Sequence, residues 1–382
     1  MVPSDSTVGC PSPWYYRGWM IGLVGVFFWG LVGYRQQWQR GLAVTALSDQ
    51  TPWGLYIANF LFLVGIAASA VVLLAAVQLF HRQDLSPTLL PAKALAITAV
   101  LMSLLFVTAD LGHPERIWHA LPLLGSLNFP TSILAWDILA LSAYLLLNIG
   151  QVWRQSRTMT PSAPPSRYTV GMGSIIAIVL GLSIHTITAF MLAGTPSRPM
   201  WFSPLLAPRF IVSAFAAGSA LMIILFLILN RLALFSLPQS AIRFLSQVLT
   251  ATLLTHLFLL GVESFSHIYP FVHQGGIDHH EIPWTLWTQV AIGLIILATL
   301  IMIYLRGRMN LQMVTIACVF TLTGIWMEKG LGLVISGLNP TPLGEWVVYI
   351  PSAVEIQISL GIWAFGALLL TELLRWIVRH RS

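Results

Sequence analysis

The chain has 382 residues, of which 57% are hydrophobic and only 8% are charged, and its mean hydropathy is +0.81. A soluble domain cannot bury that much apolar surface, so these values exclude a water-soluble globular protein and indicate an integral membrane protein. The net charge of +6 comes mostly from loop lysines and arginines and indicates no nucleic-acid partner. The two cysteines, Cys10 and Cys318, are too few to hold an iron–sulfur cluster or a CxxCH haem attachment within this chain.

Apolar runs of membrane-spanning length recur from one end of the chain to the other. A helix needs roughly 20 residues to cross about 30 Å of hydrocarbon. The runs predict an all-α integral membrane protein with ten transmembrane helices. In chain order these are 18–33, 55–80, 92–109, 131–149, 170–192, 210–229, 244–262, 284–305, 311–327 and 353–374.

The distribution of lysine and arginine predicts the orientation. With ten spans, 13 of the 19 basic residues fall on the side that holds both termini, and 6 fall on the other side. The positive-inside rule therefore predicts that both termini are cytoplasmic. The segment "DLGHPERIWH" (110–119) then faces outward, towards the periplasm if the cell has one.

Ionisable groups gather near the outward ends of the predicted spans. The segment "LLFVTADLGHPERIWHALP" (104–122) alone holds Asp110, His113, Glu115, Arg116 and His119. A charge in the membrane midplane costs about 2.5–3.5 kcal/mol on insertion scales, so such residues are functional candidates by default. By depth, the further candidates in the outer half are Tyr56, Asn59, Asp137, His185, Arg209, Glu263 and Glu328, and His256 is expected at mid-depth. Glu328 is expected to end the ninth span.

Helical spacing groups some of these side chains. Tyr144 and Asn148 follow Asp137 by seven and eleven residues, so all three share one helix face. Such stripes are expected to line a cavity or the bundle interior. Structural interpretations remain open: Asn59 and Asn148 can be interhelical hydrogen-bonding groups, and Arg116 or Arg209 can form ion pairs with Asp110 and Asp137. His119, His273, His279 and His280 are expected in solvated loops.

A weak internal repeat divides the chain. Sliding "LLFVTADLGHPERIW" onto "LFLLGVESFSHIYP" sets Asp110 against Glu263, and small residues precede both segments. This predicts two four-helix bundles, at 53–192 and 210–334, with the first and last spans added.

Five segments in order carry a resemblance to a known family: "PWGLYIANFLFLVGIAASAVVL", "DLGHPERIWH", "ILAWDILALSAYLLLN", "SIHTITAFMLAG" and "APRFIVSAFAAG". Together they resemble the NrfD/PsrC family, the membrane subunits of polysulfide reductase and related respiratory complexes. The ten-span length is most similar to the branch with DsrP, the P subunit of the Dsr sulfite-reductase-associated membrane complex.

The resemblance implies a quinone-reactive subunit in the cell inner membrane. It implies a quinone, menaquinone or ubiquinone, as bound substrate, with no haem and no iron–sulfur cluster in this chain. It implies electron exchange with a ferredoxin-like iron–sulfur subunit on the periplasmic face. Further redox subunits, such as a cytochrome c, a cytochrome b or a molybdoenzyme, would complete the complex. The acids of the "DLGxP" and "WD" motifs correspond to Asp110 and Asp137.

On this interpretation Asp110 and Asp137 exchange protons with the quinone, and His185 is a relay or hydrogen-bond partner. The expected quinone-binding residues are Tyr56, Asn59, His113, Tyr144 and Arg209. The candidates for a proton pathway are Asn148, His256, Glu263 and Glu328. Arg209 and Arg116 are expected to hold the two aspartates ionised or to help dock the partner.

Two other functions remain open. A b-type cytochrome needs histidines facing each other across helices, and only His185 and His256 lie well inside spans. A secondary transporter is compatible with the repeat and the buried acids, but no span is visibly interrupted near its middle by glycine and proline.

Overall fold

The computed structural model describes residues 13–120, 125, 129–158, 171–195, 198, 200–235, 237–273, 286–308, 310–341 and 344–379. Every regular element among these residues is a helix, and ten spans are long and apolar enough to cross a membrane, which confirms the predicted all-α membrane fold. The elements are α1 (Pro13–Arg40), η1 (Gly41–Val44), α2 (Leu55–Ala67), α3 (Ser69–Gln78), η2 (Gln83–Thr88), α4 (Leu89–Asp110), η3 (Pro114–Ala120), α5 (Ile133–Thr158), α6 (Met172–Ala193), α7 (Leu206–Arg231), α8 (Gln239–His273), α9 (Leu286–Tyr304), α10 (Leu311–Ile325), η4 (Trp326–Gly332), α11 (Leu333–Leu338) and α12 (Ala353–Arg379).

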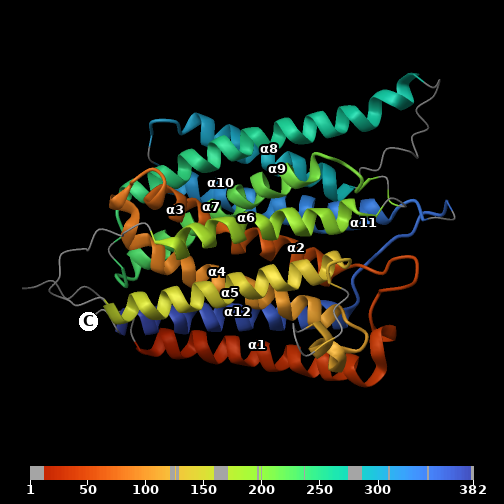
Figure 1. Cartoon of the computed structure of the whole chain (residues 1–382), viewed down its shortest axis with the longest axis horizontal. Coiled ribbons are helices and arrows are strands. Elements are labelled where there is room, and N and C mark those ends of the chain that lie inside the picture. Colours follow the sequence, from red (N-terminus) through yellow and green to blue (C-terminus); the bar gives the residue numbers. More distant parts are fainter. Residues whose placement is uncertain are drawn as a thin grey trace, which may run out of the picture.

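Consecutive spans run in opposite directions along one bundle (Figure 1). The start of α1 and the end of α12 lie at the same end, which we call the terminal end. The opposite end, where α4 finishes and α11 lies, is called the distal end.

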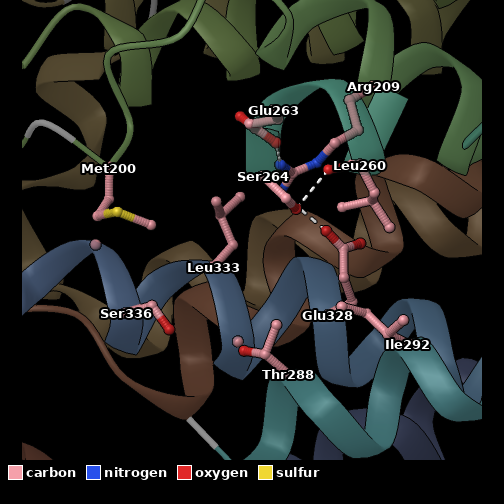
Figure 2. A pocket seen from close by; sticks show the side chains of 12 residues that line it. Met200, Arg209, Leu260, Glu263, Ser264, Thr288, Ile292, Glu328, Leu333 and Ser336 are labelled. Carbon is pink, nitrogen blue, oxygen red and sulfur yellow. Dashed lines mark hydrogen bonds and ion pairs between the residues drawn. The ribbon is translucent and has the colours of Figure 1, made fainter. Parts of the chain in front are cut away.

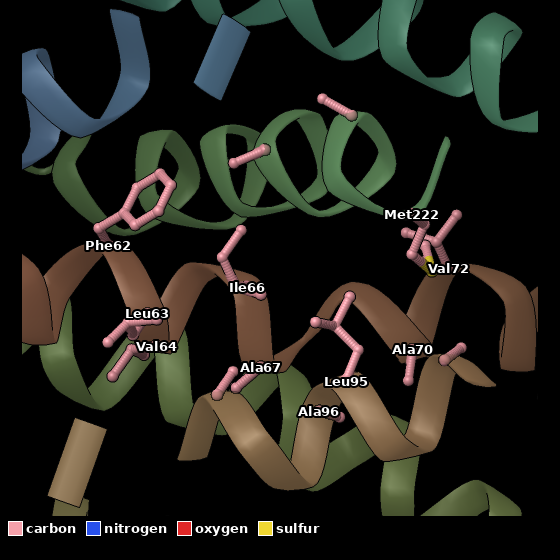
Figure 3. Close-up of a cluster of buried hydrophobic side chains, with 14 of the residues drawn as sticks. Phe62, Leu63, Val64, Ile66, Ala67, Ala70, Val72, Leu95, Ala96 and Met222 are labelled. Atoms are coloured by element: carbon pink, nitrogen blue, oxygen red, sulfur yellow. The ribbon is translucent and has the colours of Figure 1, made fainter. Parts of the chain in front are cut away.

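The core is built around α2, α3 and α4. In the most hydrophobic 18-residue stretch of α2–α3, 94% of the residues are buried, whereas in that of α1 only 11% are buried. Helices α2 and α3 are therefore central, and α1 presents its apolar side chains to lipid. Figure 3 shows Phe62 and Ile66 of α2 in a cluster with Leu95 of α4 and Met222 of α7. Helix α2 is apolar on every side, as expected for a helix surrounded by others.

Helices α2 to α6 pack closely on one another, and helices α7 to α10 do the same. In addition, α1 pairs with α12, and α12 packs on α4. Where α1 meets α12, a Cβ added to Gly30 would lie 2.5 Å from Gly361 Cα, so only glycine allows this approach. The division into two repeated four-helix bundles stays a prediction.

Two spans are interrupted, and neither interruption was predicted from the sequence. The second span breaks at Ala68, between α2 and α3, where Ser69 lies against Gly218 of α7. The ninth span contains the π-helical segment η4 and then continues as α11 to Leu338. The expectation that Glu328 ends this span is therefore wrong. Glu328 lies inside the span because its charge has a buried partner there.

Several predicted spans were too short. Helix α8 has 35 residues, or about 52 Å at 1.5 Å per residue, and extends well past the predicted 244–262. Helix α1 likewise exceeds 18–33 by several residues at each end. The predicted starts at 170 and 284 and the histidines at 279 and 280 lie outside the described residues.

Candidate functional site

A first group of polar side chains lies at the distal end, where α4 finishes at Asp110. Asp110 Oδ1 is buried and accepts no hydrogen bond from the described residues. Beside it, Gln37 of α1 donates to Ala109 O at 2.6 Å and accepts from Tyr56 Oη of α2 at 2.7 Å. Asp110 also sits at the negative end of the α4 dipole, which does not compensate its charge. The backbone beside Asp110 is thus held in place by Gln37, and Asp110 Oδ1 can still accept a hydrogen bond.

Glu355, which no sequence pattern above singled out, is fully buried beside this group. Its Oε2 accepts from the backbone N–H groups of Ser352 and Ala46, at 2.8 and 2.9 Å. Glu355 N in turn donates to Ser352 Oγ at 3.2 Å. This is a capping box, S-x-x-E, and the letters "SAVE" carried the signal.

Tyr349 completes the Glu355 environment. Its hydroxyl donates to Glu355 Oε1 at 2.6 Å and accepts from Leu55 N at 2.8 Å. A Cβ on Gly54 would collide with the Tyr349 ring, so glycine is required there. Burial, reinforced by the hydrogen bond to Glu355, raises the pKa of the Tyr349 hydroxyl, which therefore remains a donor.

Asp137 forms a separate group on α5 and α6. Its side chain is buried, and Oδ1 accepts from Thr188 Oγ1 at 2.9 Å. Thr188 also donates to Ile184 O at 2.8 Å, so its hydroxyl is shared. His185 lies three residues before Thr188, on the same side of α6. Thr188, which binds Asp137 of α5, and His185 therefore share one face of α6.

His185 of α6 and Lys329 of η4 are both buried. His185 Nδ1 is bonded to Gly181 O at 2.9 Å, and its Nε2 is buried. Lys329 is only 2% exposed. Its Nζ lies 3.5 Å from Phe210 O and 4.1 Å from the centroid of the Phe210 ring. Lys329 therefore lies inside the ninth span, which was predicted from the sequence to end at residue 327.

A second buried charge group joins α7, α8 and η4 (Figure 2). Arg209 pairs with Glu263 through Nη1 and with Glu328 Oε1 at 2.8 Å through Nη2. His256 Nε2 lies 3.4 Å from Glu328 Oε2. The expectation that Arg209 pairs with Asp110 or Asp137 is wrong, because its guanidinium is occupied by two glutamates. One arginine holding two carboxylates is a geometry that its forked donors favour.

A small cavity adjoins this charge group. Its volume is about 60 Å³, and its walls include Arg209, Glu263, Ser264, Thr288 and Glu328. Ligand pockets usually measure ~300–1,000 Å³, whereas a water occupies about 30 Å³ in the liquid. The cavity therefore suits a few waters and is too small for a quinone ring.

Three predicted site residues make structural hydrogen bonds. Asn59 Oδ1 accepts from the indole N–H groups of Trp326 and Trp363, each at 3.1 Å, and so joins α2 to η4 and α12. Tyr144 Oη donates at 3.1 Å to Ala67 O, the carbonyl beside the α2–α3 break. Asn148 Nδ2 donates to Tyr144 O at 2.8 Å within α5.

The polar residues of the "DLGHPERIWH" segment after Asp110 are exposed. His113 Nδ1 lies 2.8 Å from Glu115 Oε1, with more than half of each side chain accessible. The pKa of Glu115 is lowered mainly by a backbone hydrogen bond and, to a smaller extent, by the hydrogen bond with His113. Arg116 is exposed as well. These side chains form a polar surface at the distal end, so Arg116 does not supply a buried partner for Asp110.

The candidate residues thus fall into three groups rather than one. Asp110 lies with Tyr56, Asp137 lies with His185, and Arg209 lies with Glu263, Glu328 and His256. The first two groups belong to α2–α6 and the third to α7, α8 and η4. Within the described residues, no three His, Cys, Asp or Glu side chains are arranged to hold a metal ion.

Comparison with known proteins agrees with this architecture. Residues 43–339 match the family model described as "Polysulphide reductase, NrfD". The chain is 26% identical to a Halobacterium salinarum protein provisionally named as a dimethyl sulfoxide reductase membrane subunit, over 96% of this chain and 92% of that protein. It is 24% identical to a selenate reductase subunit of Mesobacillus selenatarsenatis, over 74% of each chain.

A third relative carries a quinol in its name. The chain is 23% identical to the Hdr-like menaquinol oxidoreductase integral membrane subunit of Archaeoglobus fulgidus, over 82% of this chain and 78% of that protein. The family match covers well over half of the chain and coincides with all spans except the first and the last. With its ten membrane-crossing helices, the chain belongs to the NrfD family of reductase membrane subunits.

Proposed function

We propose that this chain is the quinone-reactive membrane subunit of a respiratory oxidoreductase. It exchanges electrons between the membrane quinone pool and an iron–sulfur partner docked at the distal end, within a complex that holds further redox subunits. Family membership and the menaquinol-linked relative support this proposal. The observation that supports Asp110 as part of the quinone site is that its buried Oδ1 has no hydrogen-bond partner in the described part of the chain.

Asp110 and Asp137 are proposed to handle the two protons that accompany two electrons on a quinone. Asp110 Oδ1 is available to bond a ring hydroxyl, while Gln37 and Tyr56 hold the backbone beside it. Thr188 Oγ1 donates to Asp137 Oδ1, and His185 lies on the same face of α6 as Thr188. Leu105 and Trp136 near the two acids expose more than a third of their surface, which leaves them open to a lipid-soluble ring arriving through the bilayer.

The charge group around Arg209 is proposed to conduct protons rather than to bind the quinone. Its adjoining cavity has room for waters only, and Glu263, Glu328 and His256 offer exchangeable sites around it. Asn148, bonded within its own helix, remains a candidate for the opposite half of such a route. Arg209 is therefore proposed to position Glu263 and Glu328, instead of contacting the quinone.

The distal end is proposed to face the periplasm across the inner membrane, with both termini cytoplasmic. Lys93, Arg209 and Lys329 are buried in the bundle. Without them, 12 basic residues remain on the terminal side and four on the distal side. The asymmetry that sets orientation is thus larger than the sequence count alone suggested.

The proposal is tested with a quinone-site inhibitor whose fluorescence is quenched on binding, such as 2-heptyl-4-hydroxyquinoline N-oxide. Losing one charge-assisted hydrogen bond costs about 1.5–3 kcal/mol, so Asp110→Asn is expected to weaken binding roughly 10- to 150-fold. Asp137→Asn is expected to abolish quinone-linked electron transfer in membranes while the complex still assembles. Glu115→Gln, an exposed change at the same end, is the matched control. Wild-type affinity and turnover in both aspartate variants would contradict the proposal.

The interrupted spans favour one alternative, a secondary transporter, because broken helices often surround transported ions. The breaks at Ala68 and in η4 supply that feature. Affinity purification from the native host separates the two functions. Recovery of the chain with iron–sulfur subunits supports the redox function, and recovery of the chain alone supports transport.

A further inference from the structure

The terminal end holds a second, larger cavity that the proposed redox function does not use. It has a volume of about 660 Å³ and lies between the start of α8, the end of α9 and the start of α10. Its volume is within the ~300–1,000 Å³ of typical ligand sites. The start of α8 and the end of α9, which line the cavity, lie at the opposite end of the bundle from the end of α4 (Figure 1).

The rim of this cavity carries an uncompensated positive charge. Arg243, Arg306 and Arg308 line it, and no aspartate or glutamate among the described residues does. Arg308 stacks over Tyr304 and donates weakly to its hydroxyl at 3.4 Å, so its charge is not neutralised. The nearby Asp84 of η2 is already held by Arg82 through two hydrogen bonds, at 2.9 and 3.0 Å. Three guanidinium groups around one cavity are suited to a phosphate, which they bind through paired donors.

Further donors lie just inside the rim. Ser246 and Thr250 line the cavity from the face of α8 that carries Arg243, together with Gln247. Gln247 is exposed, so its amide N–H groups are accessible to a ligand oxygen.

The deeper wall of the cavity is apolar and open to lipid. Ala251 and Leu254 continue the same face of α8, and Met302 and Ile303 face them from α9. Leu254 and Ile303 expose 47% and 43% of their surface. Arg243 and Leu254 are eleven residues apart, about 16 Å along the helix. The cavity therefore passes from a cationic rim through hydroxyl groups to an apolar wall, in the direction of the bilayer centre.

We propose that this cavity binds an anionic phospholipid of the leaflet at the terminal end. The arginines bind the headgroup phosphate, and one acyl chain lies along Leu254 and Ile303. Basic cavities between membrane helices at the cytoplasmic side recognise lipid headgroups in this way. A free phosphate would use the arginines but would leave the apolar wall empty. The inference stands on these residues alone and does not depend on the redox proposal.

Native mass spectrometry of the full-length chain released from detergent tests the proposal. Phosphatidylglycerol, phosphatidylcholine and inorganic phosphate are titrated separately. We expect the first phosphatidylglycerol to bind at least tenfold more tightly than phosphatidylcholine. Arg243→Gln/Arg306→Gln should reduce that affinity at least tenfold. Arg17→Gln/Arg231→Gln removes the same charge from exposed positions at the same end and should leave the affinity unchanged.

A second variant keeps the test decisive if the arginine variant does not fold. Ala251→Trp fills the apolar wall without changing the charge, and it should also reduce phosphatidylglycerol affinity at least tenfold. Competition by millimolar inorganic phosphate as effective as that by the lipid would assign the cavity to a free anion and overturn the proposal. Equal affinity for the two phospholipids, or equal losses in the control pair, would overturn it as well.

Discussion

Replacing Arg209 should destabilise the protein far more than replacing an exposed arginine. Arg209 and Lys329 carry two positive charges against the two negative charges of Glu263 and Glu328, and all four side chains are buried. Arg209→Gln leaves two carboxylates near each other with one cation. Removing one partner of a buried ion pair typically costs 3–5 kcal/mol, because the remaining charge is desolvated and uncompensated. We expect a loss of about that size.

A compensating variant separates charge from shape. In Arg209→Gln/Glu263→Gln the buried charges balance again, so its loss should be smaller than that of Arg209→Gln alone by about 1–2 kcal/mol. The surface counterpart is Arg82→Gln. Arg82 and Asp84 are each more than 40% exposed, and an exposed pair contributes less than about 1 kcal/mol.

The assay is unfolding in mixed micelles with a rising mole fraction of dodecyl sulfate, followed through the fluorescence of the chain's 15 tryptophans. The midpoint and slope give the unfolding free energy of each variant. Two results would refute the reasoning: an Arg209→Gln loss no greater than that of Arg82→Gln, or a double variant whose loss equals the sum of its two single losses.

Two further predictions follow from close contacts at the distal end. Gly337→Ala places a methyl group against the Trp201 indole, so we expect a loss of about 1–3 kcal/mol in the same assay, whereas Gly293→Ala meets nothing within 4 Å and should change stability by less than about 1 kcal/mol. Tyr349→Phe removes the donor to Glu355; because burial raises the tyrosine pKa on folding, wild-type stability is retained below about pH 10 and falls as the pH rises further. A pH titration of unfolding should show a shallower alkaline decline in the phenylalanine variant, and identical curves would contradict this assignment.

The membrane fold was predictable because hydropathy reports it directly. All ten spans follow from apolar runs, and most helix starts agree within a few residues. The ninth span was cut short at 327 because Glu328 and Lys329 look like the end of a helix. In the structure Arg209 pairs with Glu328, so the helix continues. Burial of a charge depends on a partner far along the chain, which a local window cannot detect.

The site residues were only partly predictable. Single acids inside spans stand out, so the sequence identifies Asp110, Asp137, Glu263 and Glu328 as acids of the membrane bundle, and their place in a functional site stays a prediction. Their grouping was not predictable, because which carboxylates share Arg209 is decided by the packing of α7, α8 and η4. Glu355 was missed although its capping box is visible in the sequence. The break at Ala68 was not predicted because no glycine or proline stands there. It occurs where Ser69 closely approaches Gly218.

The pairing of α1 with α12 has a consequence for how the protein is made. Most of the contacts of α1 are with the last helix of the chain. Residues 41–352 are synthesised between the two helices, which takes roughly 15–60 s at about 5–20 residues per second. During that time the first helix must wait in the bilayer without its main neighbour. Its exposed tryptophans and phenylalanines suit α1 to contact with lipid during that interval, and insertion of α12 is then the step that gives α1 its main neighbour.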